Sequence, residues 1–174
     1  MKRIQAGVVT LVVVVLAAAA AGQAGATVEE EKAAVAKAID ASIGWFATKD
    51  VDLLLRTMAQ DPDFFVLNPD TAKTVRGIEE FKKRIPFWMS PDVRYLRHEI
   101  RDLDIHLSRG GDVAWYSAIL DDCLEFQGKP SCAWTDVRWT GVLEKREGRW
   151  VIVQMHFSFD ADKMKCKESP QPKS

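Results

Sequence analysis

The sequence lacks the signatures of several large enzyme and binding classes. It has no internal repeat, no phosphate-binding loop and no dinucleotide fingerprint, which excludes the common nucleotide-binding folds. Positive charge is not in excess, since 24 Lys and Arg residues stand against 25 Asp and Glu residues, so we expect no nucleic-acid partner. No Ser/His/Asp or Cys/His order suggests nucleophilic catalysis, and we expect no cofactor.

Cysteine is also scarce, with three residues in the chain. Cys123 and Cys132 lie on either side of a turn signal at Gln127-Gly128. In a two-residue hairpin loop they face each other at a site without ladder hydrogen bonds, where the two backbones approach closely. We therefore predict a disulfide between Cys123 and Cys132, the alternative being two unpaired thiols. Cys166 lies in a polar tail and is expected to be free or to bridge two chains.

The N-terminus has the pattern of a secretory signal peptide. Lys2 and Arg3 precede an uncharged apolar run, and a small-residue cleavage site ends at Ala26. The apolar run is shorter than the ~20 residues that a spanning helix needs, so a membrane anchor is the weaker alternative. We predict a signal peptide over 1–26, a domain over 27–160 and a polar tail over 161–174. The mature protein is then exported to the periplasm or the extracellular space, without a membrane partner.

The first part of the mature chain predicts three helices. A capping box at Thr27 and Glu30 opens a long amphipathic helix over 28–49. Asp50 can cap a short second helix. A short strand candidate follows at 64–67, and 77–85 reads as a third helix that ends at Pro86.

From residue 93 the hydrophobic period changes to two, which predicts four antiparallel strands, at 94–107, 112–126, 132–146 and 149–159. In the first of them the apolar set moves from even positions, such as Ile100, to odd ones, such as Ile105. Such a change predicts a bulge that bends the strand. The sequence therefore predicts an α+β fold, in which three N-terminal helices pack on one face of a curved, mainly antiparallel sheet.

Side-chain alternation divides the predicted sheet into two faces. If residues 146–148 form a three-residue loop, Arg138 lies opposite His156, and the earlier turn places Ser117 beside Arg138. One face is strongly apolar and needs a cover, either the helices or the sheet of a second subunit. The other face mixes polar and aromatic groups and suits the wall of a ligand pocket. Its predicted ligand-binding residues are Trp115, Ser117, Trp134, Arg138, Thr140, Gln154, His156 and Ser158.

The order of these features resembles the SnoaL-like branch of the nuclear transport factor 2-like superfamily. The motifs that carry the resemblance are Lys49-Asp50-Val51-Asp52, Asp63-Phe64-Phe65-Val66, Gly77, Arg138-x-Thr140-x-Val142, Gly148-x-Trp150-x-Ile152 and His156-x-Ser158. The resemblance implies a cone-shaped, cystatin-like α+β fold, a pocket between helices and sheet, and a homodimer. It implies no single reaction, because such proteins include isomerases, cyclases, dehydratases and binders. Relatives often carry a His where this chain has Gln154.

The sequence leaves two functions open. The first is non-catalytic binding or assembly around a small, mostly apolar molecule that can carry an anionic group. The second is a cofactor-independent isomerase, cyclase or dehydratase, with Asp121, Asp136 or His156 as the general base. The alternative for Asp136, Arg138 and His156 is a structural network in which Arg138 neutralises Asp136, and it is the interpretation that we prefer. A metal site is not expected, because a bulge would separate His98 from His106.

Overall fold

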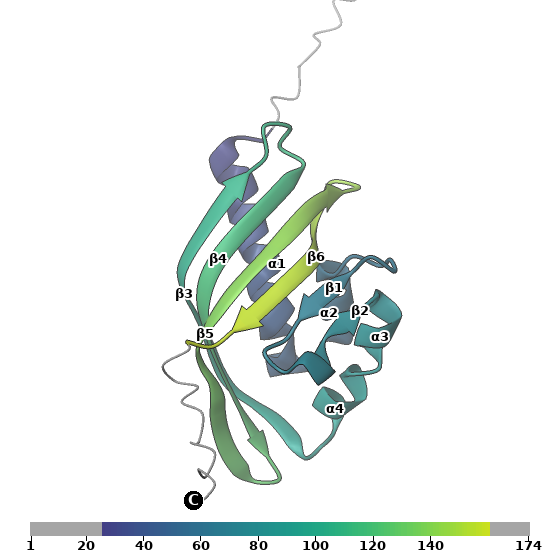
Figure 1. Cartoon of the computed structure of the whole chain (residues 1–174), viewed down its shortest axis with the longest axis vertical. Coiled ribbons are helices and arrows are strands. Elements are labelled where there is room, and N and C mark those ends of the chain that lie inside the picture. The colour runs from purple at the N-terminus through teal and green to yellow at the C-terminus, as the bar shows by residue number, and fades with distance from the viewer. Residues whose placement is uncertain (1–25, 161–174) are drawn as a thin grey trace, which may run out of the picture.

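The structure, a computed structural model, describes residues 26–160 and has the predicted α+β architecture (Figure 1). Nearly all of the predicted signal peptide, and the tail with Cys166, lie outside the described residues. No helix within 26–160 combines the length and the apolar character needed to cross a bilayer. The elements are α1 (Val28–Thr48), α2 (Val51–Thr57), β1 (Phe65–Leu67), the 3₁₀ turn η1 (Thr71–Lys73), β2 (Val75–Arg76), α3 (Ile78–Lys82), α4 (Ile85–Met89), β3 (Val93–Leu107), β4 (Val113–Phe126), β5 (Lys129–Arg146) and β6 (Arg149–Ser158).

The helices begin where the sequence signals predict, with one difference. Thr27 and Glu30 form the capping box of α1, and Asp50 caps α2 by accepting a hydrogen bond from the Leu53 amide. The third predicted helix is divided into α3 and α4, and Pro86 lies in the first turn of α4 instead of ending a helix. Proline is tolerated there because the first helical amides have no partner within the helix.

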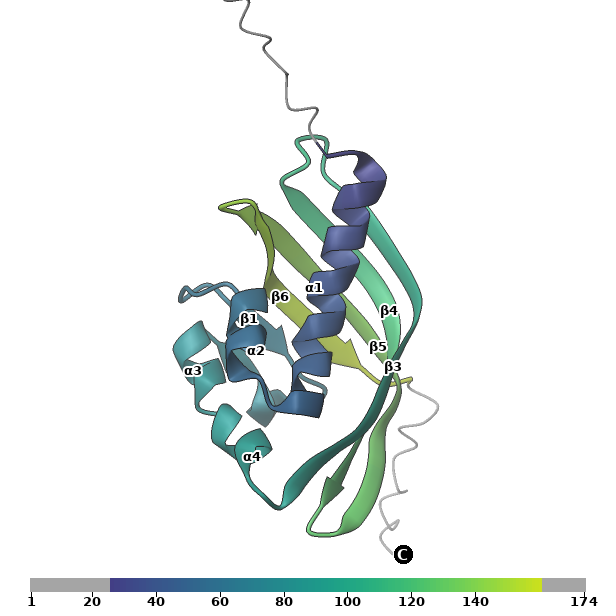
Figure 2. The ribbon, with the colours of Figure 1, turned by 180° about the vertical axis from the view of Figure 1, so that it is seen from behind.

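The strands form one sheet in the order β2-β1-β6-β5-β4-β3. All neighbours are antiparallel except β1 and β6, so the sheet is mainly antiparallel as predicted. The predicted bulge in β3 is confirmed, with a register shift between Arg101 and Asp104 and a left-handed Asp102 (φ 51°). Figure 2 shows α1 crossing one face of the sheet, while α2, α3 and α4 gather near β1 and β2.

The β4–β5 turn confirms the predicted disulfide. Glu125 pairs with Pro130 across the turn, and Cys123 and Cys132 are bonded, with their Cα atoms 4.3 Å apart. Further from the turn, two irregularities in β5 shift the pairing, so Ser117 lies opposite Thr140 and not beside Arg138. At one of them Asp136 has a left-handed backbone (φ 55°), which a sequence without glycine at that position does not signal.

The β5–β6 turn is one residue shorter than predicted. Glu147 and Gly148 form a two-residue loop, both with positive φ, which matches the twist of the flanking strands. A further shift between Val142 and Leu143 then places Thr140, and not Arg138, opposite His156.

The apolar face of the sheet is covered by helices of the same chain. Val35 and Ile39 of α1 are fully buried, as are Leu120, Val137 and Trp139 of the sheet. The Trp139 ring stacks on Phe157 at 5.5 Å and meets the Tyr116 ring edge-on at 5.2 Å. Of the two covers that the sequence allows for this face, the structure has the helices. Large side chains of α1 and the sheet pack together in one hydrophobic core.

Candidate functional site

The face of the sheet opposite α1, which we call the outer face, carries most of the predicted ligand-binding residues. Figure 1 looks onto this face. Ser117, Thr140 and His156 form one row across three strands, and a second row ends in Arg138 and Ser158. Their strand neighbours, such as Trp139 and Phe157, point to the opposite side and are buried. The structure therefore brings together Trp115, Ser117, Arg138, Thr140, Gln154, His156 and Ser158.

Trp134 is the predicted ligand residue that lies elsewhere. It stands between the two irregularities of β5, so its direction is reversed relative to the rest of the strand. Its ring packs against Phe157 at 5.0 Å and against Phe159 at 6.3 Å, on the side of the buried aromatic residues.

A groove of about 360 Å³ crosses the outer face. His106 and Trp115 form one wall, with their rings stacked at 5.6 Å and 16° apart. The His106 Nε2 atom lies 3.0 Å from a carboxylate oxygen of Asp104, which orients the imidazole. Ser117, Thr140, Val142 and Gln154 complete the lining together with parts of Tyr116 and Gly141. Trp115 is 46% exposed, so a ligand could reach its ring.

Gly141 allows the strands below this groove to pack closely. A Cβ atom there would lie 2.6 Å from both the Gln154 carbonyl oxygen and the Tyr116 ring. Tyr116 is buried, which raises the pKa of its hydroxyl well above the ordinary value, with the nearby Trp139 indole opposing that rise. Tyr116 therefore supports the groove from below as a neutral, packed ring.

Two of the predicted general bases, Asp121 and Asp136, belong to an ionic cluster with Arg101. The Arg101 guanidinium donates to Asp121 at 3.1 Å and to Asp136 at 2.6 Å. Asp121 also accepts the backbone N–H of Asp136 at 2.7 Å, which stabilises the bulge. These hydrogen bonds raise the pKa of Arg101, with that to Asp136 the larger cause. Arg138, which the sequence suggested as a partner of Asp136, donates to the Phe159 carbonyl. The cluster suits a structural role.

Asp122 is a half-buried carboxyl group that was not among the candidates from the sequence. Burial raises its pKa, an effect that the nearby His98 opposes, and its Oδ1 atom has no hydrogen-bond partner among the described residues. His98 is held from both sides, by Asp40 at 3.1 Å and by the Tyr95 hydroxyl at 2.9 Å. Adjacent residues on a strand point to opposite faces, so the sequence could show that only one of Asp121 and Asp122 faces the helices, but not which one.

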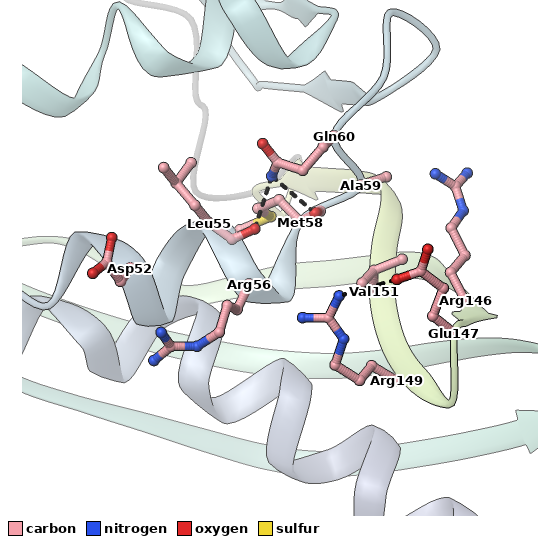
Figure 3. Close-up of a pocket in the computed structure, with 10 residues that line it drawn as sticks. All are labelled: Asp52, Leu55, Arg56, Met58, Ala59, Gln60, Arg146, Glu147, Arg149 and Val151. Carbon is pink, nitrogen blue, oxygen red and sulfur yellow. Dashed lines mark hydrogen bonds and ion pairs between the residues drawn. The ribbon is translucent and has the colours of Figure 1, made fainter.

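A second hollow of about 470 Å³ lies between α2 and the β5–β6 turn (Figure 3). Its lining combines apolar residues with three arginines, Arg56, Arg146 and Arg149. No set of three His, Cys, Asp or Glu side chains within 26–160 is grouped as a metal site would require. His98 lies against α1 and His106 on the outer face, because the β3 bulge separates them.

Comparison with known proteins identifies the fold. The sequence-family model of the SnoaL-like domain matches residues 35–162 of this chain. An NTF2-like protein from Cytophaga hutchinsonii is similar in structure, with a TM-score of 0.59 and 14% identity over 74% of this chain and 98% of that one. A cystatin-like protein from Nostoc punctiforme has a TM-score of 0.57 and 15% identity, over 77% of this chain and 93% of that one.

The association domain of C. elegans CaMKII is also similar, with a TM-score of 0.55 and 19% identity over 75% of this chain and 97% of that one. At these identities the likeness concerns the fold. No curated protein matches the chain significantly in sequence.

Proposed function

Since the chain belongs to the SnoaL-like domain family, we propose that it binds a small molecule in the outer-face groove without transforming it. The proposal is supported by one observation: the stacked His106–Trp115 pair and three hydrogen-bonding side chains line the same groove. Those side chains are Ser117, Thr140 and Gln154. Aromatic rings with a few convergent polar groups are the usual lining of small-molecule sites.

The groove chemistry indicates the kind of ligand. A flat apolar part would lie against the exposed Trp115 ring, while Ser117, Thr140 and Gln154 would orient polar groups by hydrogen bonds. His156 lies opposite Thr140 on the outer face. Arg138 lies on the same face, two residues before Thr140 in β5 and opposite Ser158. An anionic group reaching beyond the groove would therefore meet a guanidinium, which binds carboxylates in a planar, bidentate manner.

We propose that two copies of the chain associate, as the similarity to an association domain suggests. We also propose export after cleavage at Ala26, with which the Cys123–Cys132 disulfide is compatible. N-terminal sequencing of protein secreted or released from its own host should begin at Thr27; an intact N-terminus would refute the export proposal.

Native mass spectrometry of protein purified from its own host tests binding and association together. We expect a retained small molecule and two copies of the chain. Trp115→Ala should release the ligand without changing the Tm, since Trp115 is half-exposed. Phe87→Ala is the matched control, because Phe87 is a similarly exposed aromatic residue on α4, far from the groove in sequence. A ligand retained by Trp115→Ala but lost from Phe87→Ala would refute the site.

The second candidate is a cofactor-independent isomerase, cyclase or dehydratase, and Asp122 favours it. Its site would lie on the helix side of the sheet, where Asp122 is paired with His98, and not in the outer-face groove. Burial raises the pKa of Asp122, and enzymes often raise the pKa of a carboxyl group in this way so that it can act as a general acid or base. Asp121 and Asp136 suit this role less well because Arg101 engages both. Incubating the released ligand with fresh protein separates the two functions. A binder returns the ligand at unchanged mass and stereochemistry, whereas an enzyme converts it and Asp122→Asn abolishes that conversion.

A further inference from the structure

The hollow between α2 and the β5–β6 turn has an apolar floor. Leu55 and Met58 come from the end of α2, and Val151 comes from β6. Ala59 follows α2, and its backbone N–H donates to the Ile152 carbonyl at 2.8 Å, which ties the α2 end to β6. The lining shares no residue with the outer-face groove. We call this second hollow the arginine groove.

Two arginines border this floor and are weakly engaged by their acidic neighbours. Arg56 of α2 lies 4.0 Å from Asp50, and Arg149 of β6 lies 3.8 Å from Glu147. Ion pairs of this length between exposed groups contribute little. Arg146 differs, because Asp61 and Glu144 both bind its guanidinium and thereby raise its pKa. In Figure 3 the Arg146 side chain extends away from the other two.

The remaining polar groups of the lining do not neutralise the two arginines. Asp52 and Glu147 are the lining carboxylates, against the three guanidinium groups. Gln60 is held by its own helix end, since its amide nitrogen donates to the Leu55 and Met58 carbonyls at 2.7 and 3.0 Å. Figure 3 shows the Gln60 amide turned toward Leu55 and Met58. The lining therefore joins an apolar surface to two cationic groups that can take a further anionic partner.

We propose that the arginine groove binds an amphipathic carboxylate, with the hydrocarbon part on the floor and the carboxylate held by Arg56 and Arg149. Guanidinium groups match carboxylates in geometry and in charge, and their hydrogen bonds to anions exceed neutral ones in strength. A hydrocarbon body laid on this floor removes apolar surface from water, chiefly that of the half-buried Leu55, since Met58 and Val151 are already buried. A volume of about 470 Å³ lies within the range of small-molecule sites.

Calorimetric titration of the mature chain with decanoate tests this site. We expect saturable binding that weakens about tenfold in Arg149→Gln and in Arg56→Gln, the loss of one charged hydrogen bond each. Binding should also weaken as salt is added. Arg94→Gln is the matched control, because Arg94 is an exposed arginine that pairs with Glu125 outside the groove. It should bind decanoate as the unaltered chain does.

Three results would overturn the proposal: no saturable binding, equal losses in all three arginine variants, or equal affinity for decanoate and the uncharged 1-decanol. Trp115→Ala provides the remaining comparison. If it abolished decanoate binding while Arg149→Gln did not, the carboxylate would occupy the outer-face groove and the arginine groove would be excluded. Arg56 and Arg149 are exposed, so an unchanged Tm should confirm that their variants are folded.

Discussion

Removing the Cys123–Cys132 disulfide should lower stability by an amount set by the loop that it closes. The two residues are nine positions apart, and closing a loop of that length in the unfolded chain corresponds to about 2.6 kcal/mol. For a domain of this size we expect Tm to fall by roughly 10 °C. The change is Cys123→Ala with Cys132→Ala, since Cys123 is buried and alanine leaves no unpaired hydroxyl there.

Thermal unfolding followed by circular dichroism measures the loss. A Cys166→Ser background prevents exchange with the third thiol. A reductant should lower the Tm of the disulfide-bonded protein to that of the double variant, and should leave the double variant unchanged. If the two proteins melted at the same temperature, the loop-closure reasoning would be refuted, because the unfolded chain would gain no freedom from the missing bond.

Two further predictions concern single side chains. Asp122→Asn should be more stable than the unaltered chain at pH 7, and the difference should vanish toward pH 4. Burial raises the pKa of Asp122 in the folded state, so the protonated carboxyl stabilises the fold fully at low pH. This stabilisation is lost as pH rises through the raised pKa. Urea unfolding that showed a constant free-energy difference between the two proteins across this pH range would contradict the prediction. Gly141→Ala should lose about 1–3 kcal/mol in the same assay, because its Cβ would meet the Gln154 carbonyl; the exposed Ser117→Ala serves as its control, and equal stabilities would contradict the prediction.

The sequence predicted the two faces of the sheet better than its pairings. Each of the two β5 irregularities shifts the pairing with β4 by one residue. Because side chains alternate with a period of two, the second shift returns Arg138 and Thr140 to the face predicted for them. Trp134 lies between the irregularities and is reversed. The β5–β6 hairpin also contains two compensating changes. Its loop is one residue shorter than predicted, which turns Trp150 toward Glu31 of α1, and the later register shift returns Gln154 to the face predicted for it.

The difference between the bulges of β3 and β5 is physical. In β3, apolar residues such as Ile100 and Ile105 occur on both sides of the bulge, so the sequence records the change of face. In β5 the bulge at Asp136 depends on a hydrogen bond from its N–H to Asp121, a contact between distant residues. The arginine groove was missed for the same reason, because α2 and the β5–β6 turn are far apart in sequence.

The outer-face groove is built from strand residues of a hydrogen-bonded sheet, with no loop across it among the described residues. Binding of a molecule there would require no loop to open and little ordering of the backbone. Association should then proceed at close to the encounter rate, and chemically related ligands should differ mainly in how long they stay.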